Sequence, residues 1–295
     1  MPFSTHCTNH LQHSHDNEKV SLSFLNVKNL KSNHFYVEYL ANISNITYLN
    51  ELWLKKNEID LIRKISRKEK NILFKSDMDE NYSRGRPFGG QAWLIDNSFR
   101  ILEHDFLSRH LCYIELEKKG IRFFIIGVYM PFDNPNSKAD SLSMYQLTLT
   151  LILTLISKAR NNKSLLFIIG DFNADIFRFN RFDNLLKEFT TNNNLIPLDY
   201  LNSQNIDHTF QFKTANNTYK SRIDHVFMSS ESSESSQSGL LGLQCNIQDD
   251  AANMSDHNAV VLDITLVPAY HDETVSQKTI KENVNFNDEN IHFFL

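Results

Sequence analysis

The sequence carries its strongest structural signal in LLFIIGDFNADI, residues 165–176. The opening apolar run is rich in bulky and aromatic side chains, which predicts a buried strand. Gly170 ends the run, and Asp171 and Asn173 follow two positions apart, on one face if the strand continues. A carboxylate and an amide at a strand end are typical of a catalytic loop on a rigid sheet. The alternative is an Asx-turn that closes the strand.

Short apolar runs of the same kind recur on both sides of this stretch. We expect strands at residues 21–27, 91–95, 111–117, 122–130, 165–172, 207–212, 222–228 and 258–267. Helical patterns lie at 141–158 and 181–192, and the first contains LTLTLILTLI, which is apolar nearly all round and predicts a buried core helix. Many strands with few, unevenly placed helices predict an α/β fold of two packed sheets flanked by helices.

Three segments lack these patterns. Residues 1–19 are His-rich without a known zinc-ligand spacing, residues 229–239 are Ser/Glu low complexity, and periodicity is lost from Pro268. We therefore expect a disordered tail over 1–19, one domain over 20–267 with a mobile loop at 229–239, and a C-terminal tail over 268–295.

Composition excludes several classes of protein. The 295 residues hold 41% hydrophobic and 22% charged residues, so the chain is not disordered throughout. No uninterrupted apolar run reaches about 18 residues and no secretory signal is visible, so we expect an intracellular protein without a membrane partner. Cys7, Cys112 and Cys245 are odd in number and far apart, which argues against disulfides. With a net charge of −5, binding of nucleic acid needs a local basic face or a metal ion.

Two further polar motifs interrupt the apolar pattern. Asp224 lies within the apolar run SRIDHVF and needs a partner there. Ser255, Asp256 and His257 precede the last predicted strand, where an Asp-His pair can supply a metal ligand and an imidazole. The SDH motif alone is equally compatible with a turn before a strand.

The order of the motifs along the chain is more specific than any one of them. The sequence reads LNV (25–27), YLNELWL (48–54), GRPFGG (85–90), GVYMP (127–131), GDFN (170–173), HTF (208–210), IDH (223–225) and SDH (255–257). This series resembles the endonuclease/exonuclease/phosphatase superfamily, and most of all the endonuclease domain of non-LTR retrotransposons, for which GRPFGG is typical. The resemblance covers residues 20–267 and implies a four-layer sandwich of two mixed β-sheets with helices outside.

The resemblance also implies roles for individual residues. The catalytic set would be Asp171, Asn173, Asp224, His257 and Tyr129; the metal-binding set Glu51, Asn26 and Asp256; and the substrate-binding set Thr209 and Ser255. Arg86 is a further phosphate-binding candidate because it stands among closely spaced glycines. Hard carboxylate and amide oxygens suit Mg²⁺ or Mn²⁺, and no Cys/His cluster competes with them.

The chain departs from the family pattern at several positions. Lys28-Asn29 replaces the usual Asn-Gly, and Asn50 replaces the Gln before the metal-binding Glu. Gln91 follows the two glycines where a small or β-branched residue is usual. The match at Glu51 rests on a polar segment, and the alternative is a surface Glu that opens a helix.

The function that the resemblance implies is metal-dependent cleavage of DNA phosphodiester bonds, the nicking step of retrotransposition, by a monomer in the nucleus. No Tyr-x-Asp-Asp motif of a reverse transcriptase is present, so we expect a fragment of an element or a stand-alone relative. The alternatives are a phosphatase or phosphodiesterase acting on inositol lipids, sphingomyelin or RNA, an inactive copy that binds nucleic acid, and a purely structural sandwich.

Overall fold

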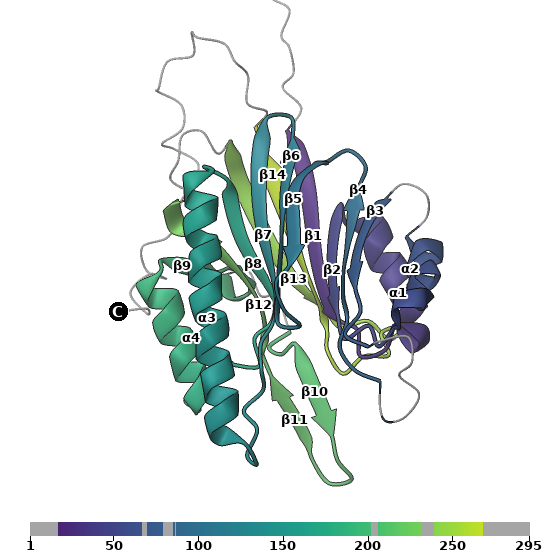
Figure 1. Ribbon diagram of the computed structural model, residues 1–295, viewed down its shortest axis with the longest axis vertical. Helices are drawn as coiled ribbons and strands as arrows, with labels where there is room; N and C mark the ends of the chain where they lie inside the picture. The colour runs from purple at the N-terminus through teal and green to yellow at the C-terminus, as the bar shows by residue number, and fades with distance from the viewer. Residues whose placement is uncertain are drawn as a thin grey trace, which may run out of the picture.

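The computed structural model describes residues 17–66, 70–78, 85, 87–201, 206–231 and 239–267. Two six-stranded sheets pack face to face, and helices cover the outer face of each (Figure 1). The expected four-layer α/β sandwich of two mixed sheets is therefore confirmed.

The first sheet has the order β13-β14-β1-β2-β4-β3. Its strands are β1 (Glu18–Asn26), β2 (Ile46–Asn50), β3 (Lys70–Lys75), β4 (Gln91–Asp96), β13 (Leu240–Gln248) and β14 (Ala259–Leu266). Its β1–β2 pair is parallel and its other pairs are antiparallel. Its outer face carries α1 (Leu30–Ile43) and α2 (Ile59–Ile65), and a short 3₁₀ turn (Lys56–Glu58) precedes α2.

The second sheet has the order β5-β6-β7-β8-β12-β9. Its strands are β5 (Arg100–Phe106), β6 (Leu111–Lys118), β7 (Ile121–Tyr129), β8 (Leu165–Asp171), β9 (Leu195–Pro197) and β12 (Asp224–Ser229). Only the β7–β8 pair is parallel among its described pairs. The remaining elements are α3 (Lys138–Asn161), α4 (Arg181–Asn192), α5 (Leu198–Leu201) and a hairpin of β10 (Phe210–Lys213) and β11 (Thr218–Ser221).

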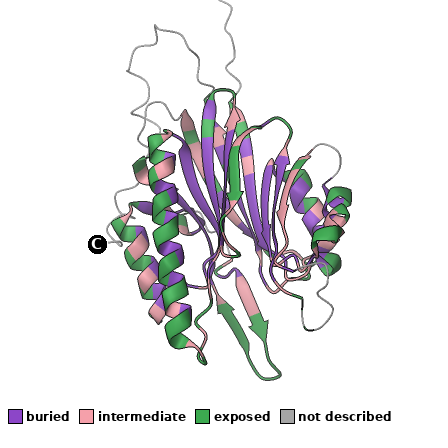
Figure 2. Ribbon diagram, viewed as in Figure 1, coloured by how far each residue is buried: buried purple, intermediate pink, exposed green. Residues whose placement is uncertain are grey.

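Alternation of side chains along each strand builds the core. On β8, Phe167 and Ile169 point between the two sheets, whereas Leu166 and Ile168 point to the layer that holds α3 and α4. The inner strands of both sheets are buried along most of their length, whereas the outer strands β3, β5 and β13 and the outer faces of the helices are more exposed (Figure 2). Because both faces of β8 are buried, its apolar run shows no period of two in the sequence.

The apolar helix α3 differs from the expectation. It lies on the outside of the second sheet, buries one face through Tyr145, Ile152 and Ile156, and exposes Leu147 and Leu153 by 53% and 41%. The expectation of a helix buried all round was wrong, because helices on a two-sheet sandwich have a partner on one side only. Among the described residues, α3 alone has the length and hydropathy of a membrane span, and core helices of soluble proteins share both properties.

The segments that were expected to lack structure fall mostly outside the described residues. Residues 1–16, 232–238 and 268–295 are in that category. β1 begins at Glu18, two residues before the expected domain boundary at 20. Cys112 and Cys245 are buried free thiols, and Cys7 lies outside the described part of the chain.

Strand register gathers the polar motifs at one end of the sandwich, the end from which the β10–β11 hairpin projects (Figure 1). The parallel pair β1–β2 sets Asn26 beside Asn50 at its carboxyl end. The parallel pair β7–β8 sets Tyr129 beside Asp171, and the antiparallel strand β12 begins there with Asp224 opposite Asp171. The polar groups therefore meet because the strand ends coincide.

We expect Gly170→Ala to destabilise the protein by about 2–5 kcal/mol. Gly170 has a φ of 149°, and an added Cβ would lie 2.0 Å from the carbonyl oxygen of Val128. Urea unfolding should be compared with Gly120→Ala, a glycine of φ 80° whose added Cβ would meet nothing within 4 Å. Equal losses for the two variants would contradict the steric argument.

Candidate active site

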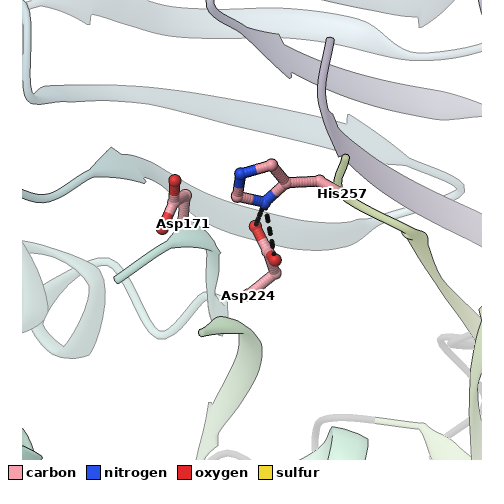
Figure 3. A group of neighbouring side chains, drawn as sticks. All are labelled: Asp171, Asp224 and His257. Atoms are coloured by element: carbon pink, nitrogen blue, oxygen red, sulfur yellow. Dashed lines mark hydrogen bonds and ion pairs between the residues drawn. The ribbon is translucent and has the colours of Figure 1, made fainter. Parts of the chain in front are cut away.

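His257 and Asp224 form a direct pair at this end of the sandwich (Figure 3). The Nδ1 atom of His257 lies 3.0 and 2.9 Å from the two carboxylate oxygens of Asp224, so Nδ1 carries a proton and donates it. Burial alone would lower the pKa of His257, but the charge and hydrogen bond of Asp224 outweigh it and raise that pKa to about 9. His257 is therefore an oriented imidazolium at neutral pH, with its Nε2 atom on the side of Asp171 (Figure 3).

Asp171 completes a buried acidic cluster. One ligand atom each from Asp171, Asp224 and His257 lies within 4.8 Å of the others. The Asp171 carboxylate accepts the backbone N–H of Asn173 at 2.9 Å and the side-chain N–H of Asn26 at 3.1 Å. Burial, followed by the negative charge of Asp224, raises the pKa of Asp171 to about 7. Asp171 can therefore accept a proton near neutral pH.

Asn173 lies two residues beyond, in the left-handed backbone region with a φ of 50°. Asparagine tolerates this conformation better than most residues. Its side-chain Nδ2 donates to the carbonyl oxygen of Met130 at 2.8 Å, which ties the loop after β8 to the end of β7. The stretch that suggested an Asx-turn thus does form one, through the Asp171 acceptor, and also places both polar side chains at the site.

Glu51 directly follows β2 and does not open a helix. Glu51 and Trp53 both have positive φ angles, of 52° and 55°. The backbone of Trp53 donates to the carbonyl of Gly89 at 2.9 Å, and that of Leu52 approaches the carbonyl of Gly90 at 3.4 Å. The glycine pair of GRPFGG therefore holds the Glu51 loop in place.

Tyr129 faces Glu51 across the site. Its hydroxyl donates a short hydrogen bond to Oε1 of Glu51. Burial, and then the charges of Glu51 and Asp171, raise the pKa of Tyr129 well above its ordinary value. Tyr129 is therefore a neutral hydrogen-bond donor, which suits an anionic ligand.

Asp256 does not stand free as a metal ligand. Its Oδ2 atom forms an ion pair with the ammonium of Lys28, a residue at which the chain departs from the family pattern. Its Oδ1 atom is buried and has no hydrogen-bond partner within the described residues. One of the two Asp256 oxygens is thus already neutralised by a cation that belongs to the chain.

Thr209 and Ser255 were expected to contact substrate, and in the structure their hydroxyls form hydrogen bonds with the backbone. Thr209 is fully buried, and its Oγ1 accepts the backbone N–H groups of Ile223 and Asp224 at 3.0 Å. The Ser255 hydroxyl donates to the carbonyl of Asn26 at 2.6 Å and accepts the N–H of His257 at 3.1 Å. Both hydroxyls position the Asp224–His257 pair. Arg86, the third expected substrate contact, lies outside the described residues.

The donor set fits a hard divalent cation. Within the described residues, Oδ1 of Asn26 is buried without a hydrogen-bond partner, beside the carboxylate of Asp171. A buried, unsatisfied amide oxygen is costly unless something binds it. Carboxylate and amide oxygens from Asn26, Glu51 and Asp171 are ligands that Mg²⁺ and Mn²⁺ prefer.

A further buried histidine, His225, holds the segments that carry the site in place, a role that was not predicted from the sequence. His225 contacts a carboxylate oxygen of Asp199 at 3.0 Å through Nδ1 and the carbonyl of Ala174 at 2.9 Å through Nε2. Both partners are acceptors, so both ring nitrogens carry protons. Burial opposes this charge, yet the Asp199 carboxylate raises the pKa of His225 overall. The pair ties β12 to α5 and to the loop that carries Asn173.

Two cavities open on either side of Tyr129. One, of about 270 Å³, is lined by Glu51, Trp53, Pro87, Phe88, Gly89, Arg109 and Tyr129. The other, of about 290 Å³, shares Arg109 and Tyr129 and continues along the loop after β7 to α3. Arg109 and Trp53 were not predicted from the sequence, because a single Arg after a strand and a Trp near a Glu fit many structures.

Comparisons with known proteins agree with the fold. No protein-family model matches this sequence, and no curated protein matches it. The solved structure of the Xenopus laevis APE2 catalytic domain is similar with a TM-score of 0.62 and 17% identity, over 86% of this chain and 94% of that one. The endonuclease domain of TRAS1, a telomere-specific non-LTR retrotransposon, has a TM-score of 0.56 and 14% identity, over 83% and 98% of the two chains.

A third similar structure is an endonuclease/exonuclease/phosphatase family protein from Bacteroides thetaiotaomicron. Its TM-score is 0.58 at 13% identity, over 85% of this chain and 99% of that chain. At such identities the similarity concerns the fold. The chain has the fold of the endonuclease/exonuclease/phosphatase superfamily, as its motifs implied.

Proposed function

We propose that this protein is a Mg²⁺- or Mn²⁺-dependent endonuclease that hydrolyses DNA phosphodiester bonds. The observation that carries the proposal is the buried Asp224–His257 pair with Asp171 beside it, all within 4.8 Å. A purely structural sandwich has no reason to bury two carboxylates together, since their repulsion and desolvation destabilise the fold.

The polar groups of the site divide the tasks of this mechanism. Asp171 accepts a proton from the attacking water. His257 presents its Nε2–H to a phosphate oxygen, and Asp224 keeps the ring oriented and charged. Tyr129 donates its hydroxyl hydrogen bond to the phosphate once Glu51 no longer accepts it. Asn26, Glu51 and Asp171 would hold a divalent cation, which would supply positive charge against the growing negative charge of the phosphate.

DNA is the proposed substrate because of two resemblances. The sequence motifs resemble retrotransposon endonuclease domains, and the TRAS1 endonuclease domain is among the similar structures. The role proposed on these two resemblances is target-site nicking, and we propose further that the protein acts as a monomer in the nucleus.

The test is conversion of supercoiled plasmid to the nicked form. We expect nicking with Mg²⁺ or Mn²⁺, none with EDTA, and recovery when excess Mg²⁺ is added back, because the buried carboxylates repel phosphate without a cation. A parallel assay with a phosphomonoester separates nuclease from phosphatase. Absence of nicking with both metals, or equal nicking with EDTA, would overturn the proposal.

A further inference from the structure

The cavity beside Glu51 has walls that the proposed mechanism does not use. Trp53, Phe88 and Pro87 line it together with Arg109, Glu51 and Tyr129. Its volume of about 270 Å³ lies near the lower limit of small-ligand pockets, roughly 300–1,000 Å³. Flat apolar walls that open on a phosphate-binding group suit the aromatic base of a nucleotide.

Charge and aromatic faces lie together in this cavity. The guanidinium of Arg109 lies over the Phe88 ring, 5.6 Å from its centroid, and Arg109 is exposed. Within the described part of the chain Arg109 forms no ion pair with a carboxylate, so its charge can meet a phosphate. Single-stranded nucleic acids are commonly bound by such a pairing of base-stacking rings and cationic groups.

The backbone at Trp53 is held in an unfavourable conformation. A φ of 55° is rare for a bulky residue, and such strain persists only where surrounding contacts fix it. Here the hydrogen bond from Trp53 to Gly89 fixes it, and an added Cβ at Gly89 would lie 2.2 Å from Oδ2 of Asp77. The fold therefore keeps the Trp53 ring at the cavity wall at a cost in stability.

We propose that this cavity binds an unstacked nucleobase of the nucleotide next to the phosphate that Tyr129 contacts, with Trp53 as the stacking surface. The assignment of the phosphate rests on the proposed function. A base within a duplex has both faces covered by its neighbours, so a stacking cavity favours single-stranded or locally unpaired DNA. Stacking also makes the cavity tolerant of base identity.

Intrinsic fluorescence tests this proposal, because the protein has two tryptophans and only one can report. Trp93 is fully buried in the core, where its ring stacks on Tyr48. In EDTA, which keeps the substrate intact, we expect a short oligothymidylate to quench emission of the wild type and not of Trp53→Phe. An oligomer of abasic sugar-phosphate units should bind more weakly and quench neither. Binding without a change in Trp53 emission would overturn the proposal.

Affinity measured by anisotropy gives a second readout. Trp53→Ala should weaken oligothymidylate binding about tenfold, whereas Trp53→Phe should restore most of the loss. The loss should be the same at low and high salt, because stacking releases no counterions. Phe35→Ala is the matched control, since Phe35 is an aromatic residue of α1 that is 74% exposed and lines neither cavity. Equal losses for Phe35→Ala and Trp53→Ala would contradict a specific cavity.

The two proposals fail separately. If the wild type quenches with oligothymidylate but nicks no plasmid, the cavity assignment stands and the nuclease assignment fails. If plasmid is nicked while Trp53 emission and the affinity of Trp53→Ala stay unchanged, the nuclease assignment stands and the base does not occupy this cavity.

Discussion

Replacing His257 by alanine should lower the kcat of DNA nicking about 100-fold or more, with little change in KM. The Nε2–H of His257 meets charge that grows as the phosphate passes through its transition state, so its loss appears in kcat and not in ground-state binding. Plasmid nicking at saturating DNA measures this effect. Asp224→Asn should act in the same direction, because an amide no longer holds the imidazolium in its charged form.

The pH dependence of nicking provides a second test of His257. Since the pKa of His257 is raised to about 9, the imidazolium persists through neutral pH and wild-type activity should fall as pH rises through about 9. The residual activity of His257→Ala should lack this alkaline decline. His104→Ala, at an exposed position of β5, serves as the control. Near-normal nicking by His257→Ala, with an unchanged profile, would remove His257 from the mechanism.

The sequence predicted those parts of the fold in which local pattern and tertiary environment agree. The run at β8 is apolar throughout because both faces are buried, and α4 (Arg181–Asn192) matches its expected range. The five-residue strand β2 and helix α1 were not predicted. α1 mixes polar and apolar residues; it buries one stripe through residues such as Tyr36, Val37 and Leu40, and leaves the apolar Phe35 exposed. β13 was also missed, because it carries half-exposed edge positions and follows low-complexity sequence.

The candidate site was predictable where motifs follow strand ends, and not where it depends on contacts between distant residues. Asp171, Asp224 and His257 each border a strong strand, and pairing brings the strand ends together. The ion pair between Lys28 and Asp256 joins residues 228 positions apart, so no local pattern reports it. The backbone hydrogen bonds of Thr209 and Ser255 were not predictable for the same reason. The sequence does not show whether a hydroxyl bonds to substrate or to the backbone of a distant segment.

Asp171→Asn should have opposite effects on activity and on stability. Nicking should fall about 100-fold or more, because the amide cannot accept a proton from water. The metal-free protein should gain about 1–3 kcal/mol in free energy of unfolding at pH 8, because a buried carboxylate beside Asp224 is replaced by a neutral group. The gain is partial, since the Asp171 charge also favours the imidazolium of His257. Urea unfolding in EDTA measures it.

The sign of the pH dependence follows from the raised pKa of Asp171. Its pKa rises from 3.8 to about 7 on folding, so between these values the folded state holds more protons than the unfolded state. Stability of the metal-free wild type should therefore decline as pH rises from about 4 to 7, and less steeply in Asp171→Asn. Added Mg²⁺ should raise the Tm of the wild type more at pH 8 than at pH 5, and that of the variant little at either pH. The prediction fails if Asp171→Asn is less stable than the wild type at pH 8, or if Mg²⁺ raises its Tm as much as that of the wild type. Either result would show that the buried Asp171 carboxylate does not destabilise the metal-free site.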